Sequence, residues 1–253
     1  MKAIMLAAGI GRRLTGDDDS GAPKSLLRFG GLTLLERHIS VLRSVGIKSL
    51  SLVIGYRADD LQAAISTYGA DDIVTPILNS EFRRGSMLSL WCARDQLRAG
   101  DSVLFMDADV LYDPDLIGRL VSAPPADCVP YDRGFEPGDE PVKLCLRGGR
   151  PVEFRKEVDP TLEHDTVGEW PGFVKFSPAG ARRVADILDQ RVAEGRLDEP
   201  YEESFRHAML EEGGISFGTL DITGLPWIEI DFPEDVIRAE TEILPRLALR
   251  SAG

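Results

Sequence analysis

Short apolar runs alternate with amphipathic stretches along the first half of the chain, and this order constrains the fold more than any other sequence feature. The apolar runs predict strands at residues 4–7, 50–54, 73–78 and 103–106. Apolar residues at helical spacing predict helices at residues 34–45, 59–68, 86–97 and 113–121. Pro76 places the third strand at a sheet edge or a bulge. The alternation predicts an α/β fold in which a mainly parallel sheet lies between two helical layers, with active residues beyond the carboxyl ends of its strands.

The pattern changes after Pro124. Residues 142–146 and 152–155 predict a β-hairpin, because a glycine pair lies between them. Further strands are expected at 172–176 and 215–222, and helices at 179–194, 202–211 and 233–249. We therefore expect one domain over residues 1–253, with a first part of roughly residues 1–123 and a second part of roughly 124–253 that carries a small β-rich insertion.

The composition excludes several classes of partner. The 253 residues are 43% hydrophobic, enough for a sizeable core, and their formal net charge is −13, with an acidic run at residues 17–19. Such a surface repels nucleic acid and anionic membrane, so we expect neither as a partner, and any nucleotide site must gather positive charge locally. The three cysteines lie far apart without disulfide or metal-ligand spacing, which favours reduced thiols in a cytoplasmic protein.

A glycine-rich turn follows the first predicted strand. Gly9 and Gly11 leave room for backbone N–H groups to face a phosphate, and Arg12, Arg13 and Lys24 supply positive charge nearby. The pattern is not a P-loop, which needs Lys-Ser/Thr after the second glycine. It also lacks the third small residue of the dinucleotide fingerprint. The alternative interpretation is an ordinary tight turn.

Carboxylates occur at two places where a metal ion could be held. Asp107 and Asp109 stand two residues apart at the end of a predicted strand, which puts them on one face. Asp231 lies near the other end of the chain. Carboxylate oxygens suit a hard cation such as Mg²⁺, whose other positions are filled by water and phosphate. The alternatives are a turn before Pro114 for the first two, and a helix cap for the third.

These segments together resemble a known family. The run Leu6-Ala7-Ala8-Gly9-x-Gly11-x-Arg13-Leu14, followed by Pro23-Lys24-Ser25-Leu26-Leu27, is similar to the signature of the sugar-phosphate and alcohol-phosphate nucleotidyltransferases. The resemblance implies a Rossmann-like fold of the GT-A type, in which the first part of the chain binds a nucleoside triphosphate. The implied nucleotide contacts are Ala7, Ala8 and Gly9 at the base, Gly11, Arg12 and Arg13 at the triphosphate, Lys24 at the reacting centre, and in addition Leu6. Lys24, Arg13 and Asp109 are the implied catalytic residues.

The end of the chain extends the resemblance. The run Trp227-Ile228-Glu229-Ile230-Asp231-Phe232-Pro233-Glu234-Asp235 is similar to the closing motif of cytidylyltransferases that act on phosphocholine or aminoethylphosphonate. This implies a Mg²⁺ cofactor held by Asp107, Asp109 and Asp231. Further implied nucleotide contacts are Asn79, Ser86, Ser89 and Asp107. An ordinary helix start is the alternative interpretation of Ser86, because serine is a favoured cap.

The second part of the chain holds the residues that the resemblance assigns to the acceptor. Lys156 would neutralise the acceptor's phosphate, and the alternative is an exposed lysine on a hairpin. Aromatic and acidic side chains would suit a cationic head group, although large aromatic residues also serve as core anchors. The implied acceptor-binding residues are Lys156, Glu169, Trp170, Tyr201, Glu202, Trp227 and Glu229.

The resemblance implies a Mg²⁺-dependent cytidylyltransferase that uses CTP to join CMP to a small phosphate- or phosphonate-bearing acceptor and releases pyrophosphate. The attacking phosphate is already an anion near neutral pH, so the site must align two anions and absorb their charge, without a general base. One alternative is a sugar-1-phosphate nucleotidyltransferase that uses UTP, GTP or dTTP. Another is a non-catalytic, nucleotide-binding regulatory domain. We expect a monomer or a homodimer.

Overall fold

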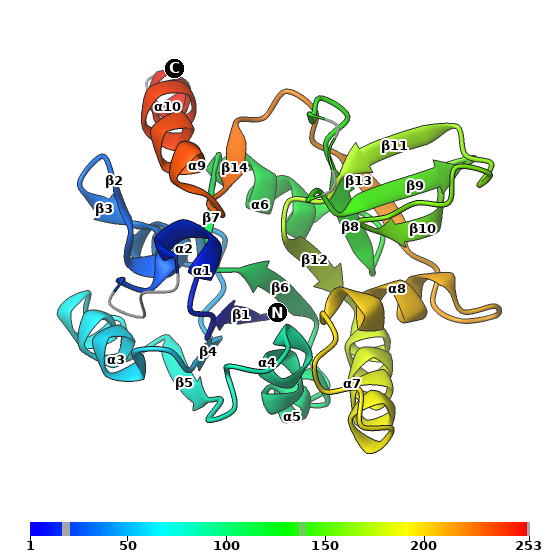
Figure 1. The fold of residues 1–253 in the computed structure, drawn as a ribbon, viewed down its shortest axis with the longest axis horizontal. Helices are drawn as coiled ribbons and strands as arrows, with labels where there is room; N and C mark the ends of the chain where they lie inside the picture. The colour runs from blue at the N-terminus through cyan, green and yellow to red at the C-terminus, as the bar shows by residue number, and fades with distance from the viewer. Residues whose placement is uncertain (17–20, 137, 139, 252–253) are drawn as a thin grey trace.

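The computed structural model describes residues 1–16, 21–136, 138 and 140–251 (Figure 1). The acidic run at residues 17–19 lies outside the described residues. Within the described part of the chain, no helix has the length and apolar character that crossing a bilayer requires.

Seven strands form the central sheet, in the order β13-β8-β12-β6-β1-β4-β5 (Figure 1). Their bounds are β1 Lys2–Ala7, β4 Leu50–Ile54, β5 Val74–Leu78, β6 Val103–Asp107, β8 Cys128–Tyr131, β12 Phe173–Phe176 and β13 Gly218–Asp221. β1 pairs in parallel with β4 and β6, whereas β12 is antiparallel to β6 and β8. The predicted mainly parallel sheet is confirmed, and β5 lies at its edge, where Pro76 is tolerated.

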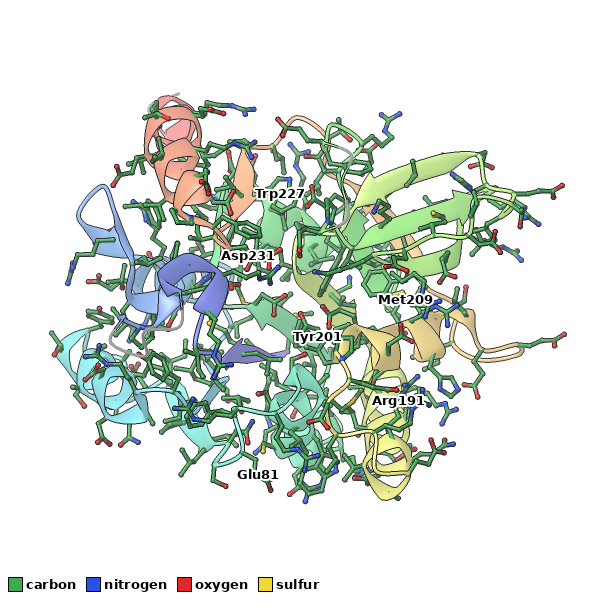
Figure 2. All side chains as sticks on the ribbon, viewed as in Figure 1. Glu81, Arg191, Tyr201, Met209, Trp227 and Asp231 are labelled. Carbon is green, nitrogen blue, oxygen red and sulfur yellow. The ribbon has the colours of Figure 1, made fainter. Side chains whose placement is uncertain are left out.

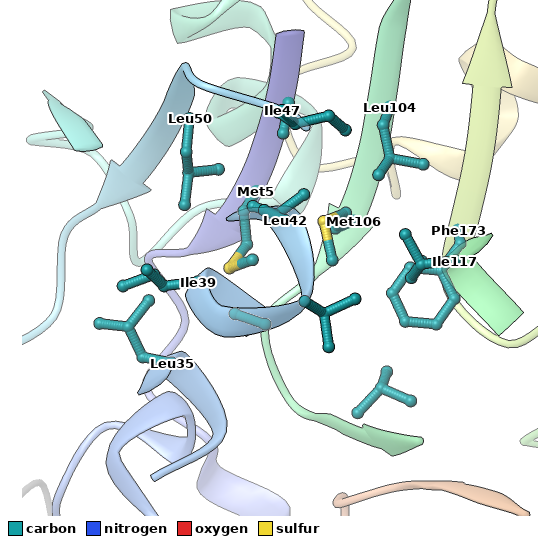
Figure 3. Close-up of a cluster of buried hydrophobic side chains, with 14 of the residues drawn as sticks. Met5, Leu35, Ile39, Leu42, Ile47, Leu50, Leu104, Met106, Ile117 and Phe173 are labelled. Carbon is teal, nitrogen blue, oxygen red and sulfur yellow. The ribbon is translucent and has the colours of Figure 1, made fainter. Parts of the chain in front are cut away.

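Helices cover both faces of this sheet. On β1, Ala3 and Met5 belong to one apolar cluster and Ile4 to another. The first cluster, seen in Figure 3, takes in α2 (Leu34–Ser44), α3 (Ala58–Thr67) and α6 (Pro114–Ser122). The second takes in α4 (Ser86–Cys92), α5 (Arg94–Leu97), α7 (Pro178–Ala193) and α8 (Glu202–Leu210). Because successive strand side chains point to opposite faces, the clusters lie on the two sides of the sheet, and the three layers are confirmed.

Local sequence sets the helix boundaries. Thr33 and Glu36 form a capping box at the start of α2: the Glu36 N–H donates to Thr33 Oγ1 (3.1 Å) and the Thr33 N–H to Glu36 Oε2 (2.8 Å). Asp113 caps α6, which has Pro114 in its first turn. The single helix predicted at 86–97 is wrong, because the backbone leaves helical geometry at Ala93 (φ −94°, ψ 10°) between α4 and α5.

A separate antiparallel sheet, in the order β10-β9-β11, stands beside the central one (Figure 1). Its strands are β9 Lys143–Arg147, β10 Arg150–Arg155 and β11 Thr166–Glu169. The predicted hairpin is confirmed, with Gly148 and Gly149 at φ 56° and 76° in its turn. Sequence reasoning did not predict β11, whose four residues show no clear alternation of apolar side chains. This sheet is the β-rich insertion.

The C-terminal segment returns to the middle of the molecule. β14 (Trp227–Glu229) pairs antiparallel with β7 (Val110–Tyr112), and the Ile230 N–H then donates to the Asp109 carbonyl (2.9 Å). Where one helix was predicted at 233–249, the chain forms α9 (Pro233–Arg238), a π-helical turn (Ala239–Ile243) and α10 (Leu244–Ser251). The pairing of β14 with β7 brings Asp231 to the end of β6.

Short elements complete the region after β1. They are α1 (Arg12–Thr15), the 3-10 turn Lys24–Leu26, β2 (Arg28–Phe29) and β3 (Leu32–Thr33). Gly11 begins α1 with φ 74°, in the left-handed region. The chain thereby turns back so that Lys24 packs against Gly11.

Candidate active site

A cleft of about 450 Å³ opens beyond the carboxyl ends of β1 and β6. This is where an α/β sheet is expected to bind its ligand. The predicted site residues that line it are Leu6, Ala7, Ala8, Gly9, Gly11, Arg12, Arg13, Lys24, Ser86, Ser89, Asp107, Asp109, Lys156, Trp170, Tyr201, Glu202, Glu229 and Asp231. The structure therefore brings together residues that lie more than two hundred positions apart in the chain.

Lys24 lies between two carboxylates at the centre of the cleft. Its ammonium group donates to Asp109 Oδ2 at 3.0 Å and to Asp231 Oδ1 at 2.6 Å. Burial alone would lower the pKa of Lys24, but the two aspartates outweigh it and raise that pKa above its usual value. The lysine is therefore a permanent positive charge in this position.

The Lys24 side chain crosses the glycine turn. A Cβ at Gly11 would lie only 3.1 Å from Lys24 Cγ, and the backbone there has φ 74°. Both the close approach and the positive φ require glycine at this position. The glycine turn and the lysine therefore border the same cleft, as a phosphate-binding site requires.

Three carboxylates converge beside Lys24. Asp109, Glu229 and Asp231 each place an oxygen within 4.8 Å of the others. Hard carboxylate oxygens at this spacing fit Mg²⁺, which needs few protein ligands when phosphates and water complete its shell. Glu229 was expected to contact the acceptor, so its place in this group is an addition to the sequence prediction.

Asp107 has a different environment from Asp109. Its Oδ2 accepts a hydrogen bond of 2.5 Å from the Tyr201 hydroxyl, which ties the start of α8 to the end of β6. Burial, followed by the charges of Asp109 and Glu229, raises the pKa of Asp107. Gly172 (φ 88°) allows the backbone to lie close to the Asp107 side chain, because a Cβ at this position would be only 2.9 Å from Asp107 Oδ2. Tyr201 at the start of α8 and Asp231 after β14 can be followed in Figure 2.

Two cations from opposite sides of the cleft meet on one carboxylate. Glu140 Oε2 accepts from Arg13 Nη1 at 2.5 Å and from Lys156 Nζ at 2.8 Å. The second guanidinium nitrogen of Arg13 lies 3.0 Å from Asp231 Oδ2. Arg13 and Lys156 thus form a pair able to hold an anion next to the candidate metal ligands.

Glu202 lines the cleft beside this pair. One of its carboxylate oxygens, Oε2, is buried without a hydrogen-bond partner, and burial raises the pKa of the group. Trp170 and Tyr201, whose ring centroids are 6.3 Å apart, form an apolar wall next to it. Both rings are almost fully buried, so they are core anchors as well as cleft residues.

Three predicted site residues do not line the cleft. Asn79 is buried and binds the protein itself: its amide donates to Ser89 Oγ (3.0 Å) and its carbonyl accepts from the Glu81 N–H (2.9 Å). Glu169 and Trp227 instead line a neighbouring cavity of about 300 Å³. That cavity shares Glu140, Glu229 and Asp231 with the cleft.

Sequence reasoning missed several residues of the cleft. They are Ile10, Ser25, Phe82, Arg83, Arg84, Ala108, Glu140 and Val142. The pair Arg83-Arg84 was visible as local positive charge just before the 86–97 helix pattern. Ser25 lies inside the quoted signature, and its buried hydroxyl has no hydrogen-bond partner. Nothing in the sequence distinguishes Glu140 from the other acidic residues.

The cleft at the end of the sheet combines a glycine turn, basic side chains and converging carboxylates. Residues 3–169 match the model of the MobA-like NTP transferase domain, and the chain belongs to that family. This agrees with the resemblance found in the sequence.

Relatives include the bifunctional IPC transferase and DIPP synthase of Rubrobacter xylanophilus, 29% identical over 96% of this chain and 52% of that protein. The CTP:phosphoglutamine cytidylyltransferase of Campylobacter jejuni is 26% identical over 93% of this chain and 98% of that protein. The chain thus spans about half the length of the first of these relatives. The CTP:phosphocholine cytidylyltransferase of Streptococcus pneumoniae has the same fold, with a TM-score of 0.72, 18% identity and coverage of 94% and 97% of the two chains.

Proposed function

We propose that this protein is a CTP-dependent cytidylyltransferase that transfers CMP to a small phosphate- or phosphonate-bearing acceptor. The observation that carries the proposal is the position of Lys24, within hydrogen-bond distance of both Asp109 and Asp231 at the end of the sheet. A lysine from the glycine signature and carboxylates from both ends of the chain then act on one reacting centre. The nature of the relatives supports cytidine as the base.

The chain's own residues supply alignment and charge. The amides around Gly11, together with Arg12, Arg13 and Lys24, bind the triphosphate. An oxygen of the acceptor phosphate attacks the α-phosphorus of CTP, a new P–O bond forms, and the bond to the bridging oxygen breaks. Pyrophosphate leaves with the electron pair, and Lys24 neutralises its charge. Because the attacking oxygen is already anionic, no side chain has to remove a proton.

Magnesium is the cofactor we propose for this site. Asp109, Glu229 and Asp231 would hold it, and the expected role of Asp107 as a further ligand stays a prediction. A divalent ion there would stabilise charge on the α-phosphate. Lys24 contacts two of these three carboxylates, so its ammonium group and the cation would have to share them.

The two parts of the chain receive separate roles in this proposal. The first part, roughly residues 1–123, would bind the nucleotide, and the second, roughly 124–253, would bind the acceptor. A cytoplasmic location and a monomeric or homodimeric state stay predictions.

The test is a pyrophosphate-release assay of the purified protein. CTP, UTP, GTP and dTTP are each offered with a panel of acceptors: phosphocholine, 2-aminoethylphosphonate, inositol 1-phosphate and glucose 1-phosphate. We expect release with CTP and a phosphate or phosphonate acceptor. Preference for another nucleotide with glucose 1-phosphate would instead identify a sugar nucleotidyltransferase. No release with any pair would support a non-catalytic domain.

A further inference from the structure

We infer that the acceptor is a zwitterion, with its phosphate or phosphonate between Arg13 and Lys156 and a cationic nitrogen against Glu202. The inference rests on the proposed function and specifies its acceptor. The inference predicts that acceptors with an amino or ammonium group bind better than polyol and sugar phosphates. All of these compounds share the anionic group that attacks CTP.

The charge of the cleft walls is the first observation behind this inference. Among the residues that the structure describes, those of the first part give the cleft five basic and two acidic side chains, as a triphosphate requires. The described residues of the second part give it one basic side chain and four acidic ones: Lys156, Glu140, Glu202, Glu229 and Asp231. Glu229 and Asp231 belong to the candidate metal group, and Glu140 is paired with Arg13 and Lys156. Glu202 is then left to meet the acceptor, and its negative charge is complementary to a ligand that also carries positive charge.

The anionic end of the acceptor has a place in this wall. Arg13 and Lys156 reach it from the glycine turn and from the end of the hairpin, and both bind Glu140 Oε2. The carboxylate of Glu140 stands where a phosphate oxygen of the acceptor would stand. Exchange of Glu140 for a phosphate or phosphonate keeps both cations paired and puts the nucleophile next to Asp231, which is 3.0 Å from Arg13.

The cationic end has a place beside it. Glu202 Oε2 is buried and has no hydrogen-bond partner, although it belongs to a residue that lines the cleft. A buried, unpartnered carboxylate oxygen is costly, so a cation there gains the full interaction. Lys156, the basic side chain that the described residues give this wall, is already bound to Glu140. Trp170 and Tyr201 form the apolar side of this corner and suit the methylene or methyl groups next to a charged nitrogen.

The experiment compares two acceptors that differ only in charge. Phosphocholine and 3,3-dimethylbutyl phosphate have the same shape, but a carbon replaces the charged nitrogen in the second. We expect KM and, by calorimetry, Kd to be at least about tenfold lower for phosphocholine, the ratio that one modest ion pair supplies. Phosphoethanolamine, whose nitrogen also carries N–H donors, distinguishes an amine acceptor from a quaternary one.

A variant assigns the effect to Glu202. Glu202→Gln should remove the advantage of phosphocholine, so that the KM and Kd of phosphocholine become equal to those of the neutral analogue in the same variant. Glu163→Gln, a change on a loop whose acidic side chain is 87% exposed, is the matched control and should preserve the preference. Circular dichroism of both variants checks that they fold.

Two results would overturn the inference while leaving the proposed function intact. One is equal use of the charged and neutral acceptors with CTP. The other is a preference for phosphocholine that survives in Glu202→Gln. If no acceptor supports pyrophosphate release, the proposed function fails, and calorimetry still decides whether the cleft prefers the cationic compound.

Discussion

The two walls of the cleft differ in charge although they belong to one acidic protein. The wall from residues 1–123 is basic and consists of the glycine turn, Lys24 and Arg83-Arg84. The wall from residues 124–253 is acidic. Its charged side chains are Glu140 before β9, Lys156 after β10, Glu202 at the start of α8, Glu229 at the end of β14 and Asp231 just after it. Although the net charge of the chain is −13, basic side chains gather in the wall where phosphates are expected. The charge of each cleft wall therefore depends on which residues line it, and not on the average composition of the protein surface.

We expect the largest effect on activity from removing the carboxylate of Asp231, which lies where the two walls meet. Asp231→Ala should lower kcat roughly 100- to 1,000-fold, about 3–4 kcal/mol in the barrier, because it removes a candidate metal ligand and the partner of Lys24. Pyrophosphate release measures the effect. Glu234→Ala, an exposed acidic residue in the first turn of α9, is the control. Turnover of Asp231→Ala at the wild-type rate would contradict the metal assignment.

Lys24 tests the basic wall. Lys24→Met should lower kcat about 100-fold, because it removes the positive charge that stabilises the leaving pyrophosphate. The same change should strengthen Mn²⁺ binding without nucleotide, because the ammonium group no longer holds Asp109 and Asp231. Electron paramagnetic resonance of free Mn²⁺ measures this second effect, and Lys48→Met on an exposed turn is the control. Unchanged Mn²⁺ affinity would show that the lysine and the cation do not compete.

Glu169 tests the acidic side in the neighbouring cavity. Burial, followed by the charge of Asp132, raises the pKa of Glu169 from 4.5 to about 7, against the opposite effect of Lys143 and Arg238. Between these pH values the folded state holds a proton that the unfolded state has released, so this group makes the protein less stable as pH rises. Glu169→Gln should therefore raise stability by about 1 kcal/mol at pH 8 and have little effect near pH 4.5.

Thermal melts at pH 4.5, 6 and 8 measure that prediction, with Glu163→Gln as the exposed control. The difference between wild type and Glu169→Gln should grow steadily over this range. A constant difference, or one that shrinks toward pH 8, would show that Glu169 titrates like an exposed carboxylate.

The smallest expected effect concerns Glu140. Glu140→Gln releases the charge that Arg13 and Lys156 share, and should lower the acceptor KM about two- to fivefold, the size of an exposed ion pair. Glu157→Gln, an exposed residue next to Lys156, controls for the loss of one negative charge nearby. A higher acceptor KM in Glu140→Gln would show that Glu140 binds the substrate directly.

The sequence was most informative where structure is local. The segment from α2 through α3 was predicted within a residue or two, because its capping box, apolar spacing and glycine stops act over a few positions. β8 was missed, since Pro124, Pro125 and Pro130 signal a loop while tertiary packing makes a buried strand. The reversed direction of β12 follows from connections between layers, which no local pattern reports.

The residues of the site were also predictable only where a sequence motif marks them. The closeness of Lys24 and Asp231 was expected from two motifs at opposite ends of the chain, and the structure confirms it. Glu140 could not be found, because its role depends on where a loop lies relative to Arg13 and Lys156. Asn79 was placed at the nucleotide by motif alone, whereas the structure uses its amide to fasten the start of a loop.

The pairing of β14 with β7 has a consequence for synthesis. Asp231 reaches Asp109 only after the strand at Trp227–Glu229 has docked, and this strand follows β6 by more than a hundred residues in the chain. A nascent chain can assemble the β1, β4 and β6 part of its sheet and its glycine turn while still lacking Glu229 and Asp231. The group of three carboxylates is therefore complete only after translation has passed this segment.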